Sequence, residues 1–329
     1  MSGKQTAAKS PEIGTFVAFG EFDESIESAV AIGIDSGATL LKLCVLDSAG
    51  ALHFATWSSP STNRVIDLLD RLAPDRIGVT GCGAAAIIEK LTREVSHPIE
   101  FDAWGRGANE ILAESGLASD DPYLLISIGT GTSALRVAGD QVERVGGTAL
   151  GGGTALGLGL ALTGCRSHGE LVALASRGNR GSVDLLISDI YEKLEIPIAA
   201  EATASSFGKL ARSLDVNAAA GQGHDENRGQ DEEATRQIDD SRKNSLVSPA
   251  KSEDLAAAVM GLVAENIALI SIARATVSGV SQIVYGGSTL YQNPSIVETI
   301  RMLTGVMGFE AIILPNSGHA GALGAMRLS

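Results

Sequence analysis

The sequence predicts an α/β protein of two domains in which a three-stranded unit occurs twice. Residues 29–57 read as three antiparallel strands joined by two short turns, and residues 123–145 read as three more in the same order. In both units the first turn is rich in small and hydroxyl-bearing residues, and helical patterns follow. A chain of 329 residues is also too long for one small core. Together these observations indicate an internal duplication.

The first half of the chain alternates strands with helices. Residues 29–34 form an apolar strand that ends in the turn 35–39, and strands at 40–46 and 51–57 complete the first unit. Residues 47–50 between them have the composition of a tight turn. Beyond this unit the pattern predicts helices at about 63–72 and 84–91, a strand at 76–80, and a helix from about 100 to 112.

The second half holds the second unit and a long helical region. Strands are predicted at 123–128, 134–137, 142–145, 282–285 and 310–314, and helices at 170–176, 184–191, 253–277, 294–307 and from about 320. Residues 217–252 carry almost no large apolar side chain and mix both charge signs, which predicts a disordered insertion. The predicted domains are a polar tail at 1–30, a first lobe at 31–120 and a second lobe at 121–329, with the last helix, 320–329, expected to pack on the first lobe.

The overall charge of the chain excludes some partners. The net charge is −14 and the isoelectric point is about 4.8. Such a chain repels phosphate backbones and anionic lipid, so we expect neither a nucleic acid nor a membrane as partner. Cys44, Cys82 and Cys165 are far apart in apolar or glycine-rich surroundings, and we expect buried free thiols in a reducing cytoplasm. The polar start of the chain lacks the apolar region of a signal peptide, so a cytoplasmic location is expected.

Residues 145–164, VGGTALGGGTALGLGLALTG, contain eight glycines and no charge. A membrane span, a linker and a backbone shaped around a ligand are the alternatives. The glycines and threonines lower the hydrophobicity below that of a typical span, and we favour the third reading. We expect a loop at 146–153 and then a helix at 154–162 whose N-terminal N–H groups face a phosphate. Gly157 and Gly159 are expected to let this helix pack closely on its neighbours.

Two glycine-rich turns, one in each unit, are the candidate ligand sites. DSGAT (35–39) and GTGTS (129–133) offer backbone N–H groups and hydroxyls to phosphate oxygens. Asp35 adds a carboxylate suited to hold Mg²⁺, directly or through water. A third turn, GGS (286–288), suits a base or a sugar. Glycine–threonine turns occur in many hairpins, so the inference depends on their order and repetition.

Seven segments in a consistent order resemble the type II pantothenate kinases, which belong to the acetate and sugar kinase/Hsp70/actin superfamily. They are GIDSGATLLK (33–42), EFDA (100–103), SIGTGTS (127–133), RVGGTALGGGTALGLGLALTG (144–164), VDLLISDIYE (183–192), ATASSFGK (202–209) and VYGGS (284–288). The resemblance implies duplicated ribonuclease H-like domains, the actin-like ATPase fold, with a nucleotide cleft between them. It also implies ATP- and Mg²⁺-dependent phosphorylation of the terminal hydroxyl of pantothenate, the first step toward coenzyme A.

The resemblance assigns roles position by position. Glu100 matches the catalytic general base, although a glutamate at this place also suits the N-terminus of a helix. Arg144 matches an arginine that contacts pantothenate, with an ordinary surface arginine as the alternative. Lys42 is expected close to the transferred phosphoryl group. The nucleotide-contacting positions are Asp35 (also for Mg²⁺), Ser36, Gly37, Ala38, Thr39, Leu40, Leu41, Lys42, Thr130, Gly131, Gly152, Gly153, Thr154, Ala155, Leu156 and Ser288.

One departure from the family and two other functions stay open at this point. Ala38 stands where the family usually has glycine, and a positive φ there would strain the first turn. The alternative functions are a kinase of the same superfamily acting on a sugar or another small alcohol, and a non-catalytic nucleotide-binding regulator. His319 is expected to cap the last helix rather than to act in catalysis. The resemblance further implies a homodimer through the helix at 253–277.

Overall fold

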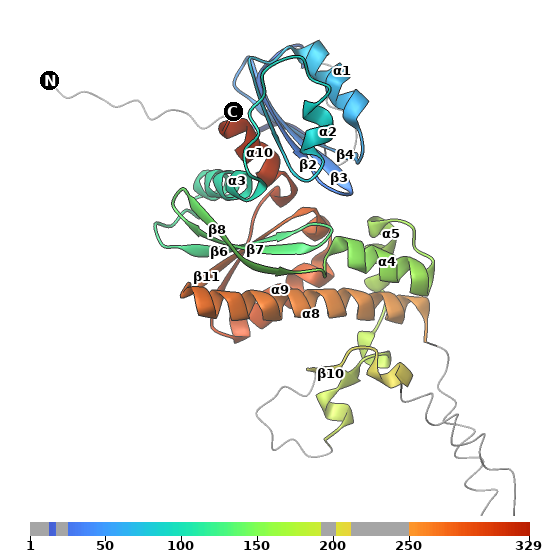
Figure 1. Cartoon of the computed structure of the whole chain (residues 1–329). Coiled ribbons are helices and arrows are strands. Elements are labelled where there is room, and N and C mark those ends of the chain that lie inside the picture. Colours follow the sequence, from blue (N-terminus) through green and yellow to red (C-terminus); the bar gives the residue numbers. More distant parts are fainter. Residues whose placement is uncertain (1–12, 18–25, 192–201, 212–249) are drawn as a thin grey trace, which may run out of the picture. The chain divides into compact units, whose positions relative to one another are not determined.

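The computed structural model describes residues 13–17, 26–191, 202–211 and 250–329, and it contains two five-stranded sheets (Figure 1). The first sheet has the order β1-β4-β3-β2-β5 and the second has the order β12-β11-β6-β7-β8. The first consists of β1 (Ile13–Val17), β2 (Ala29–Ser36), β3 (Leu40–Asp47), β4 (Leu52–Ser58) and β5 (Arg76–Thr80). The second consists of β6 (Tyr123–Ile128), β7 (Thr132–Ala138), β8 (Gln141–Thr148), β11 (Gln282–Gly286) and β12 (Glu310–Ile313).

Four strands of each sheet repeat one topology, as the duplicated sequence pattern predicts, and the fifth strand is added beyond β4 in the first sheet and beyond β11 in the second. Strands β2, β3 and β4 are antiparallel neighbours, and so are β6, β7 and β8. The first strand of each antiparallel set also has a parallel neighbour, since β5 pairs with β2 and β11 pairs with β6. The turns β2–β3 and β6–β7 therefore occupy equivalent places in the two sheets, which is the relationship that a shared ligand site requires.

Helices cover both sheets. In the first half these are α1 (Thr62–Leu72), α2 (Ala84–Ile88) and α3 (Glu100–Glu114). The later ones are α4 (Gly152–Thr163), α5 (His168–Ala175), α8 (Ser252–Ser278), α9 (Pro294–Val306) and α10 (Ala320–Arg327). One apolar core joins α1 and α2 to the first sheet, and a second joins α3 and α10 to side chains from both sheets. Figure 1 shows α3 and α10 between the two sheets.

The last helix, α10, packs on the first sheet through backbone-to-backbone contacts. A Cβ atom on Gly33 of β2 or Gly78 of β5 would collide with carbonyl oxygens of α10, at Ala322 and Ala325 respectively. On the other side, a Cβ on Gly324 of α10 would collide with the carbonyl of Ala103 in α3. Small residues at these positions allow α10 to lie flat between β2 and α3, and they explain why this helix is built from alanine and glycine.

The chain divides into two compact units, residues 1–154 with 265–329, and residues 155–264. The first unit contains both sheets, and the predicted lobe boundary near residue 120 falls between α3 and β6, where the chain passes from one sheet to the other. The second unit contains most of α4, all of α5, the short strands β9 (Leu185–Leu186) and β10 (Thr203–Ser205), and the start of α8. In it Gly159 packs directly on Leu171, as expected, whereas Gly157 faces open space.

Several predicted elements differ from the structure. Residues 13–17, placed in the polar tail, form strand β1 parallel to β4. The helix predicted at 184–191 is instead strand β9 and a single 3-10 turn, because the carboxylate of Asp184 accepts the backbone N–H of Phe207. Helix α2 stops at Ile88, three residues early. Most of the insertion predicted at 217–252 lies outside the described residues, and Ser252 begins α8.

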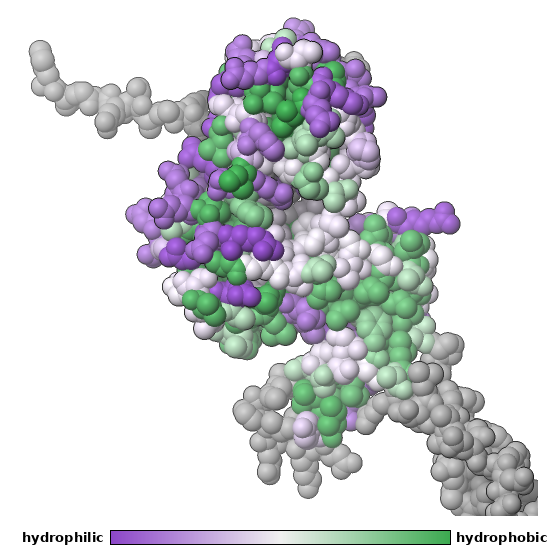
Figure 2. Space-filling view, viewed as in Figure 1, coloured by the Kyte–Doolittle hydropathy of each residue, from purple (hydrophilic) through white to green (hydrophobic). Residues whose placement is uncertain are grey.

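One helix in the described part of the chain, α8, is long and apolar enough to cross a membrane. In its most apolar window, however, 67% is buried within the protein, which is typical of a core helix. Helix α4 is apolar but shorter, and its Leu160 and Leu162 are exposed. Figure 2 shows a hydrophobic surface over this part of the molecule.

Candidate active site

The turn between β2 and β3 holds a buried ion pair. The register of the two strands places Asp35 directly opposite Lys42, and Nζ of Lys42 lies 3.4 Å from Oδ2 of Asp35. The side chain of Asp35 is 3% exposed and that of Lys42 is 10% exposed. Glycines close the site around the carboxylate, because a Cβ on Gly81 or Gly321 would lie within 2.8 Å of one of its oxygens. Backbone therefore encloses Asp35 on two sides, and the carboxylate has little freedom to move.

The first turn itself is unstrained at the position where it departs from the family. The described non-glycine residues with positive φ are Ala73, Phe207, Gln292 and Asn316, so Ala38 is not among them. The strain that the sequence suggested for Ala38 is therefore absent. Among the predicted nucleotide contacts in this turn, Leu41 points into the apolar core, so only its backbone can serve a ligand. Ala38 and Thr39 are exposed at the tip.

The turn between β6 and β7 meets the first turn. The hydroxyl oxygens of Thr39 and Thr130 lie 3.0 Å apart, across 91 residues of sequence. Within the second turn, the N–H of Gly129 donates to the carbonyl of Gly131 at 2.8 Å. The two candidate phosphate turns, which belong to separate three-stranded repeats, are thus joined at their tips.

The glycine-rich segment supports the second turn from behind. Strand β8 continues through Gly146 and Gly147 to Thr148, so the loop predicted at 146–153 is reduced to three residues. The N–H of Gly152 donates to the carbonyl of Gly129 at 2.8 Å, and the N–H of Gly153 donates to the carbonyl of Thr130 at 3.0 Å. These two N–H groups are therefore used within the protein by the second turn. The prediction that the N–H groups of a helix starting at Thr154 face a phosphate stays a prediction.

Glu100 begins α3 beside the ion pair. Glu100 as a whole is exposed, but partial burial of its carboxylate, together with the negative charge of Asp35, raises its pKa, while the positive charge of Lys42 opposes the shift. Thr80 pairs with Asp35 between β5 and β2, and its hydroxyl donates to the carbonyl of Pro98 at 2.9 Å. This bond anchors the chain two residues before Glu100, so the start of α3 lies near the β2–β3 turn.

Arg144 lies close to the same helix end. Its guanidinium carbon is 5.8 Å from the centre of the Phe101 ring, within the range of a cation–π contact. Phe101 follows Glu100 directly, so the start of α3 carries the candidate base and supports the candidate substrate-binding arginine. Gly147 gives this side chain room, because a Cβ there would lie 3.0 Å from a guanidinium nitrogen of Arg144.

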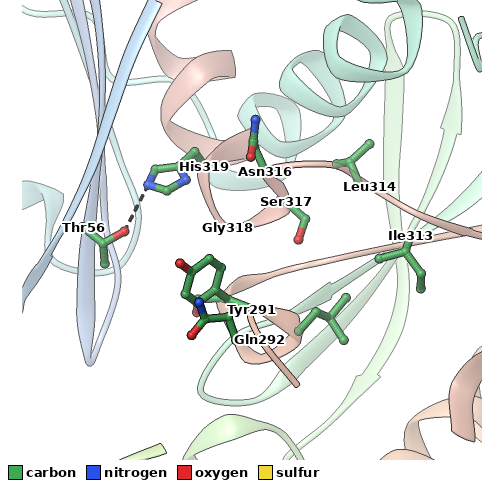
Figure 3. A pocket seen from close by; sticks show the side chains of 11 residues that line it. Thr56, Tyr291, Gln292, Ile313, Leu314, Asn316, Ser317, Gly318 and His319 are labelled. Atoms are coloured by element: carbon green, nitrogen blue, oxygen red, sulfur yellow. Dashed lines mark hydrogen bonds between the residues drawn. The ribbon is translucent and has the colours of Figure 1, made fainter. Parts of the chain in front are cut away.

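The third turn borders a pocket of about 230 Å³ (Figure 3). Gly287 has a φ of 123°, and a Cβ there would collide with the backbone of Ile128, so only glycine fits. The hydroxyl of Thr289 donates to the carbonyl of Gly129 at 3.0 Å, which connects this turn to the second one. The pocket is lined by Thr56, Ser288, Leu290, Tyr291, Gln292, Ile313, Leu314, Asn316, Ser317, Gly318 and His319.

Most of the predicted site residues lie in the first compact unit, residues 1–154 with 265–329. Ala155 and Leu156 belong to the second unit, so their predicted contact with nucleotide remains a prediction. Cys82 is exposed and Cys165 is partly exposed, so of the three free cysteines Cys44 alone is fully buried as expected. Burial raises the pKa of the Cys44 thiol far above its ordinary value.

Sequence reasoning missed two residues next to the ion pair, Thr56 and His319. His319 occupies the N-cap position of α10, as expected, but its side chain does not cap the helix. It reaches instead to Thr56 on β4. The sequence pattern could have identified Thr56, because it pairs with Lys42 on the neighbouring predicted strand. It could not have identified His319, because the approach of His319 to Thr56 is a contact across 263 residues.

Comparison with known proteins shows the family of the chain. The family model Fumble matches residues 37–328. A type II pantothenate kinase of Staphylococcus haemolyticus is 33% identical over 298 residues, which cover 91% of this chain and 99% of the relative. A type II pantothenate kinase of Oceanobacillus iheyensis is 32% identical over 297 residues, which cover 90% and 98%.

Solved structures share the fold at low sequence identity. The activator of the 2-hydroxyisocaproyl-CoA dehydratase from Clostridium difficile, with bound ADPNP, matches with a TM-score of 0.53 and 18% identity, covering 90% of this chain and 92% of its own. A ROK family glucokinase from Streptomyces griseus, in complex with glucose and AMPPNP, matches with a TM-score of 0.50 and 14% identity, covering 91% and 98%. The fold and the paired turns define a protein of the actin-like ATPase class. Within that class, the chain belongs to the Fumble family, the type II pantothenate kinases.

Proposed function

We propose that the protein transfers the γ-phosphoryl group of ATP to the terminal hydroxyl of pantothenate, the first step toward coenzyme A. The observation that carries this proposal is the anchoring of the start of α3 beside Asp35, because Thr80 pairs with Asp35 and binds the carbonyl of Pro98 just before Glu100. A candidate base therefore lies beside the paired turns that suit phosphate. The names of the relatives, which are 29% to 33% identical, support pantothenate as the acceptor.

In this reaction the acceptor oxygen attacks the γ-phosphorus and the bond to the β-phosphate oxygen of ADP breaks. Glu100 accepts the proton that the acceptor hydroxyl loses, and its raised pKa makes it a stronger base than an ordinary glutamate. Lys42 and the hydroxyls of Thr39 and Thr130 bind phosphoryl oxygens and stabilise the charge on them, which is the larger part of catalysis in phosphoryl transfer. Arg144, held over Phe101, binds the acceptor.

The residues around Asp35 fit a Mg²⁺ ion that arrives with the nucleotide. The described part of the chain contains no group of three or more histidine, cysteine or acidic side chains placed to hold a metal by themselves. Mg²⁺ commonly uses one or two carboxylates and fills its remaining positions with water and phosphate oxygens. Asp35 would supply that carboxylate, directly or through water, and the ion would neutralise charge on the phosphates.

The test is a measurement of ADP release with purified protein, ATP and Mg²⁺. Pantothenate, a panel of hexoses and a sample without acceptor are compared at equal concentrations. Turnover with pantothenate alone supports the proposal. Turnover that requires a hexose would favour a sugar kinase instead, and ATP binding without any acceptor-dependent turnover would favour a nucleotide-binding regulator.

Two further properties belong to the same proposal. We infer a homodimer through α8, on which Leu269 and Val277 are 56% and 80% exposed, and a cytoplasmic location. Light scattering coupled to size-exclusion chromatography tests the dimer. A monomeric mass at micromolar concentration would contradict it, and replacement of Val277 by glutamate is expected to shift a dimer toward monomer.

A further inference from the structure

A row of buried polar side chains crosses the first sheet on one face. The register pairs Asp35 with Lys42 between β2 and β3, and Lys42 with Thr56 between β3 and β4. Directly paired residues on neighbouring strands point to the same face of a sheet, so these three side chains lie side by side. His319 continues the row, because its Nε2 lies 3.0 Å from Oγ1 of Thr56, as Figure 3 shows. None of the four residues is more than 8% exposed.

His319 makes its hydrogen bonds to β4 through one ring nitrogen. Its Nε2, which lies 3.0 Å from the hydroxyl of Thr56, also lies 3.2 Å from the carbonyl oxygen of Ala55. With the hydrogen on Nε2 the ring donates to Ala55, and with the hydrogen on the other nitrogen it accepts from the Thr56 hydroxyl, so either form binds β4. The imidazole ring lies 5.4 Å from the ring of Phe54, centre to centre, on the same strand. Three consecutive residues of β4 therefore contact one histidine.

The electrostatic surroundings keep this histidine neutral. Burial, together with the positive charge of Lys42, lowers the pKa of His319 to about 4, although its hydrogen bond to Ala55 opposes the shift. A charged imidazolium in this place would repel the ammonium group of Lys42. The neutral ring instead supplies a hydrogen bond to β4 without competing with Lys42 for Asp35.

His319 lies where the chain passes from the second sheet to the helix that packs on the first sheet. It follows the connection from β12 in the second sheet and precedes α10, which packs on the first sheet. The hydrogen bonds of His319 to β4 therefore attach this crossing segment to the strand that lies beside Lys42.

We propose that His319 is a positioning residue that, through Thr56 and β4, holds the ammonium group of Lys42 beside Asp35. The inference rests on the proposed function only for the part Lys42 plays in phosphoryl transfer. A displacement of a charged group by about 1 Å from its productive place can cost about a hundredfold in rate. Loss of the histidine is therefore expected to lower kcat, while the turns that bind the nucleotide keep KM near its original value.

Four variants test this role: His319→Leu, His319→Gln, Thr56→Val, and His319→Leu combined with Thr56→Val. We expect His319→Leu and Thr56→Val each to lower kcat about 10-fold to 100-fold, with KM for ATP changed less than about threefold. His319→Gln retains an N–H donor for Ala55 and is expected to restore most of the activity. The double variant is expected to be no slower than the worse single variant, because both remove one connection.

Results of three kinds would overturn the proposal. The first is a kcat of His319→Leu that stays within twofold of the original while its melting temperature falls. The second is an equal loss of kcat in His319→Gln and His319→Leu. The third is a double variant whose fold-loss of kcat is the product of the two single fold-losses. Circular dichroism of each variant shows whether it is folded, and Thr56→Val and His319→Gln keep the test valid if His319→Leu does not fold.

A measurement without pantothenate separates this inference from the proposed function. Acetylation of lysines by a succinimidyl ester, read by peptide mass spectrometry, reports how well Lys42 is held, with the exposed Lys90 as internal reference. We expect Lys42 to react faster in His319→Leu and Thr56→Val than in the original protein, at an unchanged rate for Lys90. Faster acetylation of Lys42 in the two variants, in a protein that does not phosphorylate pantothenate, would refute the proposed function and leave the positioning role of His319 intact. Unchanged reactivity of Lys42 in a protein that does turn over pantothenate would refute the positioning role alone.

Discussion

The hydroxyls of Thr39 and Thr130 form a hydrogen bond 3.0 Å long between the tips of two hairpins from different sheets. Neither residue lies in the core, and both side chains are exposed. The contact therefore marks the point where the two halves of the duplicated fold present hydroxyl donors to the same space. A phosphate chain bound there would be offered donors from both sheets.

The first prediction concerns these two hydroxyls. Thr39→Val and Thr130→Val are each expected to weaken ATP binding about threefold to tenfold, the usual cost of one hydrogen bond. Stability should change little because both side chains are exposed. Isothermal titration with a non-hydrolysable ATP analogue measures the affinity, and Thr→Ser at each position is the control that keeps the hydroxyl. An unchanged affinity in both valine variants would show that the paired turns do not hold the nucleotide.

The second prediction concerns the candidate base. Glu100→Gln keeps the shape of the side chain but cannot accept the proton, so kcat is expected to fall about 10²-fold to 10⁴-fold, with the affinity for ATP unchanged. Glu114→Gln, in the last turn of the same helix, is the matched control and should retain full activity. Steady-state kinetics with pantothenate provide the measurement. Activity within twofold of the original in Glu100→Gln would exclude the residue as base.

The third prediction follows from the raised pKa of Glu100. The base must be ionised, so kcat/KM is expected to rise with pH, with a midpoint above the ordinary glutamate value of 4.5. Lys42 lowers this pKa, and Lys42→Met removes that effect. The residual activity of this variant should therefore rise at higher pH than the activity of the original protein. A midpoint that stays in place or moves to lower pH would contradict the assigned interaction.

The fourth prediction concerns Arg144. Arg144→Ala removes the charged donor held over Phe101, and KM for pantothenate is expected to rise about 10-fold to 100-fold, the cost of a hydrogen bond between charged groups. The control is Arg106→Ala, since Arg106 is 47% exposed and lies 3.7 Å from a highly exposed Asp140. Equal KM values in both variants would identify Arg144 as an ordinary surface arginine.

The fifth prediction concerns stability and the buried His319. Because its pKa is about 4 in the folded protein and 6.5 ordinarily, the unfolded chain binds more protons between these pH values. The free energy of unfolding should therefore fall as the pH decreases from about 6.5 to 4, with His319 contributing up to about 3 kcal/mol. His319→Gln should reduce this slope and His97→Gln, at an exposed site, should not. Urea unfolding at several pH values gives the comparison, and equal slopes in all three proteins would contradict the shift.

Local sequence patterns predicted most of the fold. Alternating apolar residues and turn residues identified the strands of both units, and the repetition of the first turn indicated the duplication. The pattern failed at 184–191, where an apolar run of helical appearance forms strand β9, because Asp184 binds the backbone of Phe207 from a distant segment. It also failed at the end of β8, since glycine is a poor strand former and Gly146 and Gly147 are held in the sheet by β7.

The sequence by itself determined the two glycine-rich turns, their places at the ends of equivalent strands, and the family to which the chain belongs. Those properties depend on residue type and spacing within short segments. Only the tertiary structure decided that Thr39 touches Thr130, that α4 gives its first N–H groups to the second turn, and that His319 reaches β4 beside Lys42. Each of these contacts joins residues far apart in the chain, and such contacts depend on how sheets and helices pack, which no local pattern encodes.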